Sequence, residues 1–284
     1  MLAACAALSL TAAGAAAAPL PPAAIFTDPP HDAAHPARMD VLHIPSGGGE
    51  LNAIALVPAG AAPHPTVVLF HGLPGNEKNL DLAQAMRRAG WTVVAPNYRG
   101  SWGSPGHYSF KGNLEDARAV LAYVRGPQGA KLGVDPRRLV IMGHSMGGWV
   151  TAVTGGRDEG VAGAALISAA DMSTTARAPE KVRLDLARDN HESLAATPED
   201  MAAELATLTP GEGFAAAAPG LAKHPLLVIT SDDGLQANAD KLVMDVKTRG
   251  GRVAVVHIAT DHSYDDARIR LESEVLAWLA KLPK

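Results

Sequence analysis

The chain has 284 residues, of which 47% are hydrophobic and 19% charged, and this composition excludes an intrinsically disordered protein. Its 25 basic and 29 acidic side chains give a formal charge of -4, so no positive excess would draw it to nucleic acid or to an anionic membrane surface. Aromatic residues make up only 4%, which argues against a stacking platform for single-stranded nucleic acid.

The first 18 residues form an apolar, alanine-rich run of signal-peptide length, too short for a membrane span. Small residues from Gly14 to Ala18 offer cleavage sites, which favours export to the periplasm or the medium. The basic segment that usually opens a signal peptide is missing, so an unstructured tail on a cytoplasmic protein is the alternative. Leu2-Ala3-Ala4-Cys5 resembles a bacterial lipobox, but apolar sequence continues after Cys5, which makes lipidation the weaker interpretation.

Cys5 is the only cysteine in the sequence. Zinc ribbons, iron–sulfur clusters and disulfide scaffolds are therefore excluded. The proline-rich residues 19–38 are typical of an extended linker, after which residues 39–44 and 51–57 flank a glycine-rich turn and predict a β-hairpin. No later run of 18 apolar residues lacks charges or helix breakers, so the sequence predicts no membrane span.

Short apolar runs then alternate with amphipathic helical patterns along residues 39–284. The runs lie at residues 66–70, 91–95, 139–142, 161–167, 226–229 and 253–258, and they are typical of parallel strands buried on both faces. Helical patterns include residues 114–124, 146–154 and 264–282. This order predicts an α/β fold with a doubly wound, mostly parallel β-sheet flanked by helices.

Residues 171–224 interrupt this alternation, because they contain helical patterns and no good strand. Thr197 followed by Pro198 and two acidic residues is a strong helix start. A long insertion in a domain of this kind is usually functional. We therefore expect a small helical cap over one end of the sheet, inserted before the late strands.

Gly143-His144-Ser145-Met146-Gly147 is the strongest chemical signal in the chain. It follows a predicted buried strand directly and opens a predicted helix, which is the context that a nucleophile elbow requires. The structural alternative is a glycine-rich turn in which the serine has no catalytic role. Because the helix start supplies free N–H groups and partial positive charge beside the serine, the context favours Ser145 as a nucleophile.

A second loop, His71-Gly72-Leu73-Pro74-Gly75, follows the strand predicted at residues 66–70. An oxyanion hole needs two backbone N–H groups aimed at the developing alkoxide. The amide of Leu73 and the amide of Met146, which follows the serine, are the candidates. The structural alternative is an ordinary turn that contains glycine and proline.

These two loops, together with Tyr98-Arg99-Gly100, resemble the α/β-hydrolase superfamily over nearly everything from Met39 onward. Residues 135–143 look like its dienelactone hydrolase and prolyl-oligopeptidase branches. The resemblance implies a catalytic acid after a late strand and a histidine near the C-terminus. On that pattern the acid is Asp233, with Asp232 second and Asp171 a distant third, and the base is His262.

The resemblance therefore implies a serine hydrolase that cleaves carboxylic esters of small substrates through an acyl-serine intermediate. The alternatives are a serine peptidase of the prolyl-oligopeptidase type and a catalytically idle binding protein on the same fold. Of the remaining histidines, His257 lies within a predicted strand and is expected to be packed. The spacing of the histidine, aspartate and glutamate residues does not indicate a metal site, and the sequence contains no phosphate-binding loop of the kind that binds a nucleotide cofactor. We therefore expect neither a metal nor a cofactor.

Overall fold

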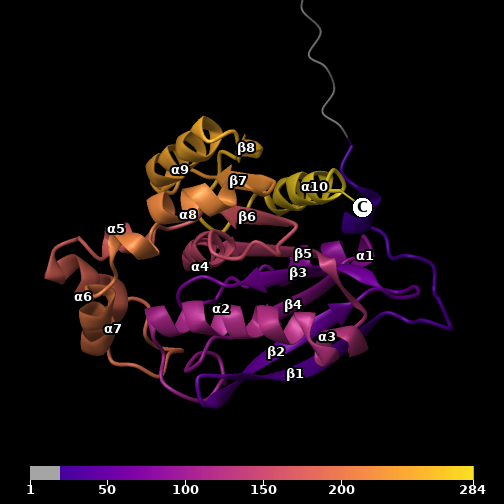
Figure 1. Cartoon of the computed structure of the whole chain (residues 1–284), viewed down its shortest axis with the longest axis horizontal. Coiled ribbons are helices and arrows are strands. Elements are labelled where there is room, and N and C mark those ends of the chain that lie inside the picture. The colour runs from indigo at the N-terminus through magenta and orange to yellow at the C-terminus, as the bar shows by residue number, and fades with distance from the viewer. Residues whose placement is uncertain (1–19, 284) are drawn as a thin grey trace, which may run out of the picture.

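Eight strands pair into one sheet in the order β1-β2-β4-β3-β5-β6-β7-β8 (Figure 1). The computed structural model describes residues 20–283, so the leader expected at residues 1–18 lies outside the described residues. The strands are β1 (Arg38–Ser46), β2 (Gly49–Val57), β3 (His64–Phe70), β4 (Thr92–Pro96), β5 (Val134–His144), β6 (Gly163–Ile167), β7 (Leu226–Thr230) and β8 (Val253–His257).

The sheet is antiparallel at one edge and parallel elsewhere. β1 and β2 form the predicted hairpin, and β2 pairs antiparallel with β4. Every later pair, from β4 with β3 to β7 with β8, is parallel. The predicted doubly wound, mostly parallel sheet is confirmed, and the carboxyl ends of its parallel strands meet at one edge, where such folds bind their ligands.

Helices cover both faces and bury two hydrophobic clusters against the sheet. α1 (Leu80–Arg88) and α10 (Arg268–Leu279) pack on one face. The other face is covered by α2 (Phe110–Arg125), α4 (Met146–Gly155), α8 (Phe214–Leu221) and α9 (Gln236–Thr248). The short α3 (Pro127–Lys131) follows α2. Burial of the apolar strand residues between these layers supplies the main driving force for the fold.

Residues 171–224 are helical, and their helices belong to two different parts of the structure. α5 (Met172–Thr175), α6 (Glu180–Arg188) and α7 (Pro198–Leu205) lie beyond the end of the sheet, at the left of Figure 1. A turn of 3₁₀-helix, Pro210–Glu212, leads from them into α8. α8 packs against α4 and α9 and so belongs to the layer beside the sheet. The projecting part is therefore shorter than expected and ends near residue 212.

The proline-rich stretch departs from the linker expected for residues 19–38. Ala23–Ile25 form a turn of 3₁₀-helix, and Ala24 and Ile25 pack against the cluster under α1 and α10. Arg88 of α1 donates hydrogen bonds to both backbone carbonyls, at 2.5 Å to Ala24 and 2.9 Å to Ile25. This part of the stretch is docked on the domain because its apolar side chains and carbonyl groups both find partners.

Two expectations near the C-terminus are wrong. The last helix begins at Arg268 and not at Tyr264, because Tyr264 has a φ of 61° that a right-handed helix cannot contain. β8 is not buried on both faces, since it is an edge strand and Val255 is 44% exposed. For the same reason His257 is not packed, and its side chain is 39% exposed.

Candidate active site

Ser145 lies at the sharp turn between β5 and α4. Its backbone has φ 57° and ψ -123°, a sparsely populated conformation for a residue with a side chain. The flanking glycines permit the turn: a Cβ on Gly143 would lie 2.0 Å from the Gly147 carbonyl oxygen, and one on Gly147 would lie 2.2 Å from that of Phe70. Strain of this kind at a strand end is typical of a functional residue that the surrounding structure holds in place.

Asp233 and His262 meet at the carboxyl edge of the sheet, after β7 and β8. His262 Nδ1 lies 2.8 Å from Asp233 Oδ2, and the carboxylate side chain is only 4% exposed while the imidazole is 39% exposed. Burial alone would raise the pKa of Asp233, but hydrogen bonds from His262, from the Leu235 N–H and from nearby serine hydroxyls hold it well below its usual range. The carboxylate is therefore ionised at neutral pH and fixes a proton on Nδ1.

The two other acidic candidates lie in different surroundings. The side chain of Asp232 is 64% exposed and lies 3.2 Å from His257 Nε2, away from His262. Asp171 caps α5, where its carboxylate accepts hydrogen bonds from the backbone N–H and hydroxyl of Ser173, and it also accepts one from the Phe214 N–H. Asp171 thus joins the start of the projecting helices to α8. Of the three carboxylates, only Asp233 contacts His262.

His144 ties the histidine loop to the elbow. Its Nε2 donates to the His262 carbonyl oxygen at 2.8 Å, and the two rings lie 4.7 Å apart between centroids. Burial lowers the pKa of His144 to about 4, so the ring is neutral at pH 7. Within the part of the chain that the structure describes, the Ser145 hydroxyl makes no hydrogen bond. Catalytic hydrogen bonds are often longer in a free enzyme and shorten in the substrate complex.

The loop of residues 71–75 approaches Ser145 from the neighbouring strand β3. A Cβ built on Gly72 would lie 2.9 Å from Ser145 Cβ and 3.5 Å from its Oγ, so only glycine allows this approach. The backbone N–H groups of Leu73 and Met146 have no acceptor among the described residues. Backbone N–H groups without an acceptor are the kind of donor that an oxyanion hole requires.

Three residues that the sequence did not single out surround the acid. Ser168, at the end of β6, has a φ of 41°, and its hydroxyl lies 2.8 Å from both the Ser231 hydroxyl and the Tyr264 hydroxyl. The Tyr264 ring is buried, and burial is the main cause that raises its pKa to about 12. The sequence signal that could have identified this network is a serine directly after each of two consecutive strands, Ser168 after β6 and Ser231 after β7. This network positions the loop of Asp233 by hydrogen bonds.

The projecting helices are fastened beside the site. Leu194 forms an isolated β-bridge with Ser101, and the Ala195 N–H donates to the Gly100 carbonyl at 2.7 Å. Glu204 of α7 accepts hydrogen bonds from the Ser109 hydroxyl at 2.6 Å and from the Phe110 N–H at 2.8 Å. The Glu204 carboxylate therefore sits on the N-terminus of α2, where negative charge is stabilising.

Residues 20–283 contain no group of three or more histidine, aspartate or glutamate side chains that could hold a metal ion. Over the same residues, no helix combines the length and the apolar character that crossing a membrane requires.

Residues 67–280, three quarters of the chain, match the Alpha/beta hydrolase family. The chain belongs to this family. The solved structure of EstE1, a thermophilic and thermostable carboxylesterase cloned from a metagenomic library, is similar to that of our hydrolase, with 25% sequence identity and a TM-score of 0.65. That match covers 88% of the hydrolase and 91% of EstE1.

Other solved structures share the fold. An acylaminoacyl peptidase of Pyrococcus horikoshii has a TM-score of 0.67 at 17% identity, and the match covers 87% of the hydrolase but 42% of the peptidase. A dienelactone hydrolase of Klebsiella pneumoniae, described as putative in its own structure report, has a TM-score of 0.60 at 18% identity, over 86% of our chain and 99% of its own.

Curated relatives match over shorter segments. The uncharacterized protein Rv2307c of Mycobacterium tuberculosis is 29% identical in a match 130 residues long, which covers 38% of the hydrolase and 45% of the relative. The Alpha/beta hydrolase domain-containing protein WAV2 of Arabidopsis thaliana is 33% identical over 91 residues, 31% of the hydrolase and 28% of the relative. The match therefore spans less than half the length of these relatives.

Proposed function

We propose that this protein is a serine hydrolase that cleaves carboxylic esters of small substrates through an acyl-serine intermediate. The observation that carries the proposal is the buried Asp233 carboxylate hydrogen-bonded to His262 beside a serine in a strained elbow. A nucleophile, an acid and a base, in this order along the chain, are the parts of the hydrolase triad.

Each group has a defined role in the proposed reaction. His262 takes the proton of the Ser145 hydroxyl as Oγ attacks the ester carbonyl, and then gives that proton to the leaving alcohol. Asp233 holds the imidazole with its proton on Nδ1 and stabilises the imidazolium that forms. The amides of Leu73 and Met146 donate to the oxyanion, each contributing a factor of about 10² to 10³ in rate. Water then releases the acid from the acyl-serine.

An ester substrate is favoured over a peptide by the sequence identity of the structural matches. EstE1 is 25% identical to the chain, whereas the acylaminoacyl peptidase, at 17% identity, shares the fold alone. The test is a panel of p-nitrophenyl esters and aminoacyl p-nitroanilides. We expect ester turnover at least about a hundredfold faster. Faster anilide turnover would indicate the peptidase, and no turnover of either would indicate the idle binding protein.

Export of this esterase is a separate proposal that rests on the apolar leader and its small residues. Cleavage would place the mature N-terminus between Ala15 and Pro22. Mass spectrometry of the natively expressed protein checks it, and an intact Met1 in the cytoplasmic fraction would overturn it.

A further inference from the structure

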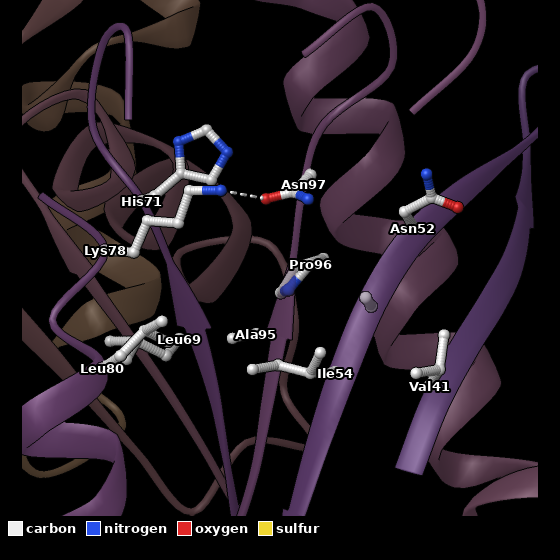
Figure 2. Close-up of a pocket in the computed structure, with 11 residues that line it drawn as sticks. Val41, Asn52, Ile54, Leu69, His71, Lys78, Leu80, Ala95, Pro96 and Asn97 are labelled. Atoms are coloured by element: carbon white, nitrogen blue, oxygen red, sulfur yellow. Dashed lines mark hydrogen bonds between the residues drawn. The ribbon is translucent and has the colours of Figure 1, made fainter. Parts of the chain in front are cut away.

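A cavity of about 280 Å³ opens on the face of the sheet that carries α1, behind the loop of residues 71–75. Figure 2 shows its two ends. One end is apolar, with walls from Val41, Ile54, Leu69 and Leu80. At the other end lie the polar groups of His71, Lys78 and Asn97, and Ser145 does not line the cavity. An apolar pocket with a few convergent polar groups is the usual form of a small-molecule site.

Lys78 gives the polar end a positive charge without a neutralising carboxylate. Its ammonium donates one hydrogen bond, at 2.9 Å to Asn97 Oδ1, and lies 4.3 Å from the centroid of the Trp102 ring. None of the ion pairs in the described part of the chain includes Lys78. Partial burial lowers the pKa of Lys78, as expected for a cation held out of water. The ammonium has three N–H donors, so it can bind an anionic ligand as well as Asn97.

His71 adds no charge at the same end. The residue is 3% exposed, and its Nδ1 donates to the Gly72 carbonyl at 2.8 Å. Burial is the main cause that lowers the pKa of His71 to about 4, so the ring is neutral at pH 7. Its Nε2 is covered and out of reach of a ligand in the cavity. Among the residues that line the cavity, Lys78 is therefore the one that carries a charge.

We propose that this cavity is a second binding site, for an amphipathic carboxylate. The carboxylate lies against Lys78, and the hydrocarbon chain lies along Ile54, Leu69 and Leu80. At about 30 Å³ for each water-sized atom, the cavity holds roughly nine non-hydrogen atoms. Heptanoate has that size.

The site touches the catalytic loop from the side opposite Ser145. Trp102, whose ring faces Lys78, donates from Nε1 to the Pro74 carbonyl at 2.7 Å, while Gly72 of the same loop faces Ser145. A ligand here contacts the oxyanion loop without entering the reaction site. Ester hydrolysis releases carboxylates of this class, a link that rests on the proposed function.

Calorimetric titration of the full chain with heptanoate, 1-heptanol and heptylamine tests the proposal. We expect one site per chain, with heptanoate binding at least about tenfold more tightly than either the alcohol or the amine. Equal affinity for the alcohol would overturn the role given to Lys78. Equal affinity for heptylamine would overturn the site.

Variants separate this site from the reaction site. Lys78→Gln should weaken heptanoate binding by at least about tenfold, whereas Lys241→Gln, which changes an exposed lysine on α9, should leave the affinity within about twofold. Ile54→Trp fills the cavity and should abolish binding. Equal effects of the two lysine variants, or unchanged binding in Ile54→Trp, would overturn the proposal. So would loss of binding after Ser145 is labelled by a fluorophosphonate, whereas failure of labelling bears only on the proposed function.

Discussion

Asp232 and Asp233 are adjacent in the chain, but their carboxylates lie in different surroundings. Asp233 is buried, accepts a hydrogen bond from the imidazole of His262 and has a pKa held well below its usual range. Asp232 lies on the surface beside His257, which is itself half-exposed on an edge strand. The turn after β7 brings the Asp233 carboxylate to His262 and leaves the Asp232 carboxylate beside His257 of the edge strand.

Asp233→Asn therefore has a large expected effect on rate. The amide cannot stabilise an imidazolium and favours the wrong tautomer of His262, so kcat for a p-nitrophenyl ester should fall by about 10⁴. Asp232→Asn is the matched control and should change kcat by less than about threefold, because its partner is a surface histidine. Steady-state kinetics measures both. A larger loss in the Asp232 variant would contradict the assignment of the acid.

At the scale of elements, α7 is joined to α2 through Glu204. Its Oε1 accepts from the Ser109 hydroxyl and the Lys111 N–H, and its Oε2 accepts from the Phe110 N–H. Glu204→Gln places an NH₂ group against an N–H donor and removes the charge from the helix N-terminus. We expect the free energy of unfolding to fall by about 1 to 3 kcal/mol.

Glu192→Gln is the control for this prediction, because Glu192 is exposed in the same projecting segment. Urea unfolding should show a change below about 0.5 kcal/mol in the control. Equal midpoints for the two variants would contradict the role given to Glu204.

The contact between α10 and α1 predicts a pH dependence. Glu272 is buried, and burial together with the nearby Asp81 carboxylate raises its pKa to about 7. The folded state therefore holds the Glu272 proton more tightly than the unfolded state, and this group's contribution to stability falls as pH rises from about 4.5 to 7.

Glu272→Gln should remove that loss. The free energy of unfolding of the variant, relative to that of the wild type, should increase by about 1 to 3 kcal/mol as the pH is raised from 5 to 8. Glu274→Gln on the same helix should show no such gain. Urea titrations at the two pH values make the comparison, and an identical offset at both would contradict the account.

For the whole molecule, much of the fold could be predicted because parallel strands buried on both faces are continuous apolar runs. The docking of Ala23–Ile25 and the exposure of β8 could not be predicted from the sequence, because both depend on which segments become neighbours in the folded chain. The strand ends that carry Ser145, Asp233 and His262 followed from motif order. The Ser168 network did not, because its members are 63 and 96 residues apart in the chain.

The projecting helices also limit the expected substrate. Among their described residues, Val182 is the only large apolar side chain that is well exposed, so they offer little surface for docking on lipid. We expect kcat/KM for p-nitrophenyl esters to peak at acyl chains of roughly two to six carbons, because a filled pocket gains no further 0.8 kcal/mol per CH₂. A rate that keeps rising with longer chains, or increases above the critical micelle concentration, would indicate a lipase.

The central claim is that Ser145 is the nucleophile, and fluorophosphonate labelling followed by mass spectrometry tests it most directly. The wild type should carry one label on Ser145, and Ser145→Ala should lose both labelling and ester turnover. Its melting temperature should stay within about 2 °C of the wild type, because the Ser145 hydroxyl has no hydrogen-bond partner among the described residues. Ser273→Ala, on the surface of α10, should label and turn over like the wild type. Label on another residue, or turnover retained by a folded Ser145→Ala variant, would contradict the account.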